Sequence, residues 1–246
     1  LSAAKANQVR YAVGYMKRYD EGVEAAKLSL LEACSTESLG PILSVHAKCY
    51  MGNSYCSAYG HVVTQEPNDH VLDGWDIAPK WLPEKYHVPF GAYLNTFSHL
   101  TNLLQYLFDE LPSIEFVNLT NHPGQLVILG FKHFLATLET GKMSSQGWNE
   151  EIRITFADGE ITLCLPPALL RNVPASVEIY HAGKVQKQIR PCFNWSWAFR
   201  RQAEAFVLDI LERRPMRNAA ETAYQDVVLT EAIWQREMAR IGQQLI

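Results

Sequence analysis

The stretch Gly91-Ala-Tyr-Leu-Asn-Thr-Phe-Ser-His-Leu-Thr-Asn-Leu-Leu-Gln-Tyr-Leu-Phe108 carries two patterns at once. Four leucines recur at the spacing of a buried helical stripe, namely Leu100, Leu103, Leu104 and Leu107. A second stripe is polar and consists of Asn95, His99, Asn102 and Tyr106. At roughly 100° per residue these four fall within about 60° of one another around the helix axis. The stretch therefore predicts a helix that is anchored by leucines and presents hydrogen-bonding groups to a polar cavity.

A plainer interpretation of the same stretch stays open. Asn95 can cap the helix, because short polar side chains satisfy the first free N–H groups. His99 can be a partly buried histidine whose hydrogen bonds are satisfied within the fold. The placement of four polar residues on one side of the helix is what favours a binding or catalytic site.

The composition is that of an ordinary globular protein. The chain has 246 residues, 48% hydrophobic and 20% charged, which suffices for one large domain or two small ones. The formal net charge is −4 and the basic residues are scattered, so we expect neither nucleic acid nor a membrane as main partner. No apolar run in the sequence approaches the length of a bilayer span.

Cysteine and histidine usage bears on compartment and metal. The five cysteines show no CxxC spacing and the sequence has no signal-peptide pattern, so we expect free thiols and a cytoplasmic location. The eight histidines include no HExxH or other close pair of metal ligands. We therefore expect no metal site.

The first part of the chain has the pattern of one strand, turn and helix. Val9–Met16 is short, apolar and β-prone, and the turn after it contains Arg18 and Tyr19. Asp20 is a suitable N-cap for the helix that follows. This order is that of the last βα unit of a doubly wound parallel sheet, whose ligands bind at the carboxyl ends of the strands.

Several motifs together resemble one family. Ala12-Val-Gly-Tyr-Met-Lys-Arg-Tyr-Asp20 and Leu39-Gly-Pro-Ile-Leu-Ser-Val-His46 resemble the join between domains in the glucose–fructose oxidoreductase/inositol dehydrogenase (Gfo/Idh/MocA) family of NAD(P)-dependent dehydrogenases. The helix quoted first resembles the family's helix that faces the nicotinamide, which carries an Asp, a His four positions later and a second Asp three positions further on. The matching residues here are Asn95, His99 and Asn102, so the spacing holds and both acids are amides.

The resemblance implies a domain organisation. Residues 1–36 would be the remnant of an N-terminal Rossmann-type nucleotide-binding domain, and residues 37–246 the C-terminal substrate-binding and oligomerisation domain. Neither a Gly-rich phosphate turn nor the family's Glu-Lys-Pro segment with its catalytic lysine occurs here. We therefore expect NAD or NADP to be bound mainly by a domain that precedes this chain. Arg18 and Tyr19 are the candidate cofactor contacts, with an ordinary surface turn as the alternative.

A long stretch between Val63 and Pro89 is rich in Pro, Asp, Gly and Trp and shows no periodicity. Its aromatic and basic residues favour an ordered lid, because such side chains stack well on sugar-like rings. The substrate-binding candidates here are Trp75, Lys80, Trp81 and Tyr86. An Ω-loop packed on its own aromatics is an equally good interpretation.

After the central helix the sequence predicts strands and turns. Asp158-Gly159 is the clearest hairpin turn and His181-Ala-Gly183 is a second. The expected strands are Ile114–Asn121, Gln125–Thr140, Glu150–Phe156, Glu160–Pro166 and Ser176–Ile189, and the expected closing helices are Ser196–Arg213 and Ala219–Gln243. The predicted fold class is α+β: a large, mainly antiparallel open sheet with helices on one face, preceded by the last βα unit of a truncated Rossmann domain.

The function that follows is oxidation of an alcohol. A base must take the hydroxyl proton as hydride leaves for the nicotinamide, and His99 is the candidate by type and by alignment, with Asn95 beside it and Asn102 positioning substrate. The full protein is predicted to be an NAD(P)-dependent dehydrogenase of a sugar, cyclitol or related polyol, forming a homodimer or homotetramer through its sheet. The alternative is a non-catalytic sugar- or nucleotide-sensing protein of the same fold, which the two amides would permit.

Overall fold

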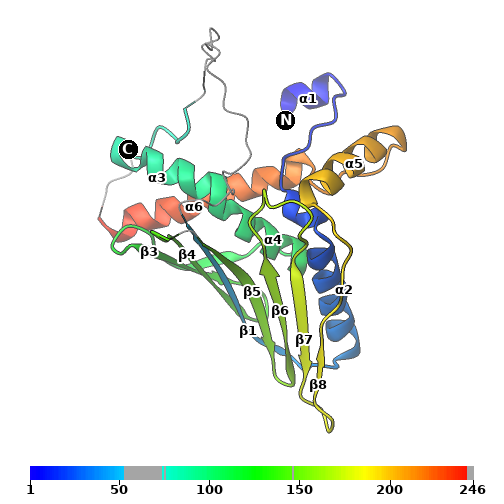
Figure 1. The fold of residues 1–246 in the computed structure, drawn as a ribbon. Helices are drawn as coiled ribbons and strands as arrows, with labels where there is room; N and C mark the ends of the chain where they lie inside the picture. Colours follow the sequence, from blue (N-terminus) through cyan, green and yellow to red (C-terminus); the bar gives the residue numbers. More distant parts are fainter. Residues whose placement is uncertain (53–73, 75, 146, 243–246) are drawn as a thin grey trace.

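The computed structural model describes residues 1–52, 74, 76–145 and 147–242 (Figure 1). These residues form an eight-stranded sheet in the order β2-β3-β4-β1-β5-β6-β7-β8. Every neighbouring pair is antiparallel except β1 and β4, which run parallel. The strands are β1 Ile42–Met51, β2 Ser113–Asn118, β3 Gly124–Gly130, β4 Leu135–Lys142, β5 Trp148–Phe156, β6 Gly159–Leu165, β7 Ser176–His181 and β8 Lys187–Ile189.

The longer helices lie on one face of this sheet, as Figure 1 shows for α2, α4 and α6. The helical elements are α1 Ser2–Ala6, η1 Met16–Tyr19, α2 Glu21–Thr36, η2 Glu84–Tyr86, α3 His87–Ala92, the π-helical turn η3 Tyr93–Phe97, α4 Ser98–Phe108, α5 Ala198–Leu211 and α6 Ala220–Arg240. The predicted α+β class, with a mainly antiparallel sheet and helices on one face, is confirmed. No helix in the described ranges is long and apolar enough to cross a membrane.

Buried and more exposed residues alternate along β1, and the buried ones form part of the hydrophobic core. Val45, Ala47, Cys49 and Met51 of β1 are buried, because alternate residues of a strand share one face of the sheet. The intervening residues point to the other face, where Lys48 forms an ion pair with Glu151 of β5 at 3.5 Å. The helix-covered face is therefore apolar and the other face charged. Cys49 is a free thiol, as are Cys34, Cys164 and Cys192, while Cys56 lies outside the described residues.

The hairpins follow the turn signals. Asp158 lies between β5 and β6, where Phe156 pairs with Gly159, and residues 182–186 join β7 to β8. The expected single strand Gln125–Thr140 is instead two strands, β3 and β4. The chain reverses between them because the Phe131 N–H donates to the Phe134 carbonyl at 3.0 Å and the two rings stack. The sequence of that turn contains no Gly–Asn or Gly–Asp pair from which a hairpin could be predicted.

The predicted first strand, Val9–Met16, is wrong. The segment is extended but makes only an isolated bridge, between Ala12 and Ala219, and then enters the short turn η1. A parallel strand needs neighbouring strands to satisfy its N–H and C=O groups, and the described part of the chain places none beside it.

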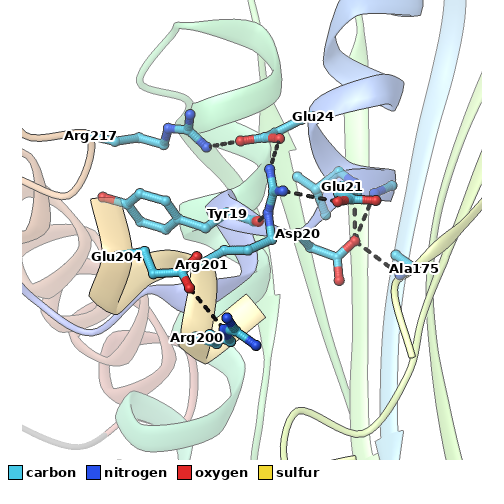
Figure 2. Close-up of polar contacts among 11 residues, drawn as sticks. Tyr19, Asp20, Glu21, Glu24, Ala175, Arg200, Arg201, Glu204 and Arg217 are labelled. Carbon is cyan, nitrogen blue, oxygen red and sulfur yellow. Dashed lines mark hydrogen bonds and ion pairs between the residues drawn. The ribbon is translucent and has the colours of Figure 1, made fainter. Parts of the chain in front are cut away.

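Asp20 begins α2, as predicted. Its carboxylate accepts hydrogen bonds from the N–H groups of Gly22 at 2.8 Å and Val23 at 3.4 Å, and from that of Ala175, directly before β7, at 2.9 Å (Figure 2). Arg201 of α5 bonds Glu21 at 3.0 Å and also Glu24 in the first turns of the same helix. The base of α2 is thus tied both to the strand region and to α5.

Helix α5 departs from the sequence expectation. The sequence predicts a core-facing side for this helix from the spacing of its apolar residues Phe199, Ala203, Phe206, Val207 and Ile210, yet Asp209 is its buried residue. Val207 is 53% exposed and Ile210 43%. Figure 1 shows α5 projecting from the body of the molecule, so these two residues stay open to solvent, whereas Phe199 near the start of α5 is half-buried against Trp197.

Candidate functional site

The central helix is interrupted where the site begins. Helix α3 runs into the π-helical turn η3, Tyr93–Phe97, and α4 starts at Ser98. Such turns insert a residue into a helix and are frequent at functional sites. Asn95 lies inside this turn and His99 directly after it. The four leucines of α4 are buried in the core as predicted, so this helix holds His99 on a rigid support.

Two cavities meet at these residues. The larger, about 850 Å³, is bounded by residues 13–15, by the π turn and start of α4, and by Val227 of α6. The smaller, about 170 Å³, is bounded by Lys17, Trp148 and residues near the start of α5. Asn95 and His99 line both cavities. The structure therefore brings together the two residues that sequence reasoning named as catalytic.

His99 is an uncharged imidazole at this position. Its Nδ1 atom is buried and has no hydrogen-bond partner within the described part of the chain. Burial, and to a lesser extent the nearby ammonium of Lys17, lower the pKa of His99 to about 3. The edge of the Tyr15 ring contacts the imidazole at 5.2 Å between centroids. At neutral pH the imidazole therefore carries one N–H donor and one acceptor nitrogen.

Lys17 is the charged neighbour of His99, and the sequence interpretation missed it. Its ammonium forms a buried ion pair with Glu150 of β5 at 2.5 Å and lies 5.6 Å from the centre of the Trp148 ring. The Trp148 indole N–H also donates to Glu150, at 3.1 Å. A signal was present in the sequence, because Glu150 shares its side of the strand with Ile152 and Ile154 and so had to be buried and paired.

Asn102 does not face either cavity. It is buried, its amide N–H donates to Asp226 of α6 at 2.7 Å, and its side-chain oxygen accepts from Arg18 Nε at 2.6 Å. Arg18 also donates to the Asn102 backbone carbonyl at 3.1 Å. Burial raises the pKa of Asp226 to about 6, against the opposing effects of Asn102 and Arg18. The polar stripe thus runs from the cavity at Asn95 into the protein interior.

The remaining candidates lie elsewhere. Arg18 and Tyr19 are buried, and Tyr19 lies under the guanidinium of Arg217 at 4.6 Å, so neither lines the cavities beside His99. Lys80 is exposed, and Trp81 packs half-buried against the core.

Tyr86 and Trp75 are the remaining two residues of the predicted lid. The Tyr86 ring contacts Trp234 of α6 at 6.1 Å between centroids, and neither it nor Trp81 lines a cavity at His99. Trp75 lies outside the described residues. The lid interpretation therefore stays a prediction for Trp75, and the structure assembles only His99 and Asn95 from the predicted set.

Comparison with solved structures defines the class of the fold. No protein-family model matches the sequence, and no curated protein matches it. A protein from Desulfitobacterium hafniense described as an NADPH-dependent oxidoreductase superposes with a TM-score of 0.67 at 15% identity over 94% of this chain. The aldose-aldose oxidoreductase of Caulobacter crescentus, solved with glycerol, gives 0.65 at 15% over 98%. Levoglucosan dehydrogenase, solved with NADH and levoglucosan, gives 0.66 at 14% over 97%.

This likeness establishes a fold. The described chain has the architecture of the C-terminal domain of Gfo/Idh/MocA oxidoreductases, as the sequence resemblance implied. The chain spans 63%, 65% and 66% of those three proteins, so it matches less than two thirds of each. The three are described as oxidoreductases, and their descriptions lend no support to the alternative of a non-catalytic sensor.

Proposed function

We propose that this chain is the substrate-binding part of an NAD(P)-dependent oxidoreductase that acts on a sugar, cyclitol or related polyol. The observation that carries the proposal is His99, whose buried Nδ1 has no described partner and which lines a cavity of about 850 Å³. An unpartnered buried nitrogen costs free energy unless a ligand satisfies it. A substrate hydroxyl that donates to this nitrogen supplies the missing hydrogen bond.

The roles of the residues follow from their protonation. His99 accepts the hydrogen bond of the reacting hydroxyl and draws its proton, since the neutral imidazole has an acceptor nitrogen. Asn95 has an amide that can donate and accept, so it orients a hydroxyl and cannot carry the proton. Because its surroundings disfavour the imidazolium, His99 does not hold this proton, which passes to water at the mouth of the cavity as hydride leaves for the nicotinamide.

The described residues do not fit the phosphates of NAD(P). Asp20 already occupies the N-terminus of α2 with its own carboxylate, which would repel a pyrophosphate there. Lys17 is committed to Glu150, and Arg18 to Asn102. NAD or NADP, which accepts the hydride when bound, is therefore proposed to be held mainly by a separate Rossmann-type domain of the complete protein, with residues 1–36 at its junction. The cofactor roles of Arg18 and Tyr19 stay predictions.

The outer face of the sheet supports the proposal of a homodimer or homotetramer. Phe116, Leu135 and Tyr180 are exposed there among the charged pairs. Light scattering of the purified protein tests this, and a monomer at micromolar concentration contradicts it. The cytoplasmic location likewise stays a prediction.

The test of function uses the complete protein with its nucleotide-binding domain and a panel of sugars and cyclitols. We expect NAD(P)H formation, a loss of at least about 100-fold in kcat for both His99→Ala and His99→Gln, and a smaller change in KM. His133→Ala, an exposed histidine in the turn between β3 and β4, is the matched control and keeps the activity. Retained activity in His99→Gln, or no cofactor reduction with any polyol, contradicts the proposal.

A further inference from the structure

The wall of the larger cavity is mainly apolar. Aliphatic residues from four separate segments line it, namely Val13, Ile77, Val88, Leu94 and Val227. Two of these line its mouth in a highly exposed state, Ile77 at 68% and Val88 at 80%. The volume of about 850 Å³ lies within the range that encloses a ligand larger than one small ring.

Few polar groups of the cavity are free to bind a ligand. The Ser98 hydroxyl donates to the Leu94 carbonyl at 2.5 Å and accepts from the Tyr15 hydroxyl at 3.4 Å. These two hydroxyls therefore satisfy each other and the backbone. His99 Nδ1 is left as a buried polar atom without a described partner, beside the exposed amide of Asn95. A ligand that needs many hydrogen bonds would not find them on this wall.

The cavity also lacks positive charge. Among the described residues that line it there is no Lys or Arg, and Asp76 contributes a negative charge at the mouth. The stretch 53–73, whose structure is not described, contains no Lys or Arg in its sequence. His99 is neutral, and the ammonium of Lys17 is bound to Glu150. A phosphate or carboxylate would enter without a counter-ion and lose its hydration there.

We infer that the substrate is a neutral sugar or cyclitol derivative that carries an apolar substituent, such as an alkyl or aryl glycoside, and not a free, phosphorylated or nucleotide-linked sugar. This inference rests on the proposed function and narrows its substrate class. The reacting hydroxyl faces His99 and Asn95, while the apolar group packs against Leu94 and Val227. Each apolar group buried this way contributes in proportion to the area removed from water.

The first test is binding to the 246-residue chain, measured by titration calorimetry with matched probes. For each of glucose, galactose and mannose, the free sugar, its phenyl β-glycoside and its 6-phosphate are compared. We expect the phenyl glycoside of at least one sugar to bind at least tenfold more tightly than its two counterparts. Binding of no phenyl glycoside, or tighter binding of a free or phosphorylated sugar, overturns the inference.

Two variants at neighbouring positions of α6 test whether the phenyl group binds in this cavity. Val227→Lys places a cation in the cavity, so it should weaken the phenyl glycoside at least tenfold and strengthen the 6-phosphate. Val228→Lys makes the same change on the exposed side of α6, where Val228 is 44% exposed, and should leave both affinities unchanged. Equal effects of the two variants overturn the assignment of the apolar group to this cavity.

Turnover separates this inference from the proposed function. If the phenyl glycoside binds with the expected preference and the complete protein reduces no cofactor with it, the substrate class stands and the proposed oxidoreductase fails. If the complete protein oxidises only free or phosphorylated sugars, the oxidoreductase stands and the apolar substrate class fails.

Discussion

At the scale of single residues, Asn102 explains how the site tolerates an amide where the resembling family has an acid. Arg18 can only donate hydrogen bonds and ionised Asp226 can only accept them, so the group between them must do both. The Asn102 amide does so, with its oxygen toward Arg18 and its nitrogen toward Asp226. The negative charge near Arg18 is therefore carried by α6 and not by α4.

This arrangement predicts the outcome of moving the acid. Asn102→Asp places a second carboxylate where the amide nitrogen lies 2.7 Å from Asp226, so two buried acids repel each other. We expect a loss of about 3 kcal/mol in the free energy of unfolding at pH 7.5, measured by urea denaturation. The double variant with Asp226→Asn again has one acid and one amide, now with the acid at position 102 and the amide at position 226. It should recover most of the lost free energy of unfolding. Asn121→Asp, on an exposed bend, is the control, and absence of recovery in the double variant contradicts the interpretation.

The raised pKa of Asp226 predicts a pH dependence. The pKa of this carboxyl is about 6 in the folded chain, above its ordinary value of about 3.9, so the folded state binds the proton more tightly than the unfolded state. The corresponding stability is complete below pH 4 and is lost as the pH rises through 6, by about 3 kcal/mol. Denaturation from pH 4 to 7.5 should show this fall in the wild type relative to Asp226→Asn. A difference that stays constant or grows with pH would rule out this titration.

The residue scale also shows the limit of reading a helix from its sequence. Asn95, His99 and Asn102 lie within a narrow arc, but the cavity ends after His99, and α6 covers the next turn. The spacing of residues along a helix predicts which side of the helix they share. It does not predict whether a cavity or another helix lies on that side. The position of α6 depends on contacts between residues more than a hundred positions apart, which no local pattern reports.

At the scale of elements, α2 depends on its first turn. Asp20 caps the helix and also binds the N–H of Ala175 at 2.9 Å, while Arg201 and Arg217 bind the acids that follow it (Figure 2). Acidic groups at a helix N-terminus are favourable because the free N–H groups there carry partial positive charge. One turn of chain thus joins α2 to the sheet and to the segments around α5.

Removing the cap should therefore cost more than a surface cap does. Asp20→Ala loses a cap worth about 0.5–2 kcal/mol and leaves the Ala175 N–H without its partner, at about 1–3 kcal/mol more. Asp20→Asn keeps an acceptor oxygen and should cost less than half as much. Thermal and urea unfolding measure both, with Glu32→Ala on the exposed side of α2 as control. An Asp20→Ala variant as stable as the control would show that water replaces both bonds.

The elements that sequence reasoning found are those whose signals are local. Asp158-Gly159 predicts its hairpin because turn geometry depends on a few adjacent residues. Asp20 predicts the start of α2 for the same reason. The π turn Tyr93–Phe97 has no such signal, and the failed strand Val9–Met16 has strand propensity without a described strand beside it. Propensity alone does not supply the partner that a strand requires.

At the scale of the whole molecule, α5 and the segment before η1 form one surface. Arg10 donates to the carbonyls of Asp209 and Arg214, and Gln202 donates to the Val13 carbonyl at 3.3 Å, so the two segments lie side by side. Their exposed apolar residues include Val9, Tyr11, Phe206, Val207, Leu208, Ile210 and Leu211. Exposed apolar residues gathered on adjacent segments are typical of an interaction site, and we predict that in the proposed oxidoreductase their partner is the nucleotide-binding domain.

Substitutions on this surface should affect the complete protein and leave the stability of the 246-residue chain unchanged. Val207→Ser with Leu211→Ser changes two residues that are 53% and 73% exposed, so the unfolding temperature of the 246-residue chain should stay unchanged while its binding of an apolar dye falls. In the complete protein the same pair should lower the unfolding temperature and raise KM for NAD(P), because the docked domain loses apolar contacts. Leu28→Ser, 68% exposed on α2, is the control for removing an exposed leucine elsewhere. If the double variant leaves the complete protein as stable and as active as the control does, this surface is not the domain junction.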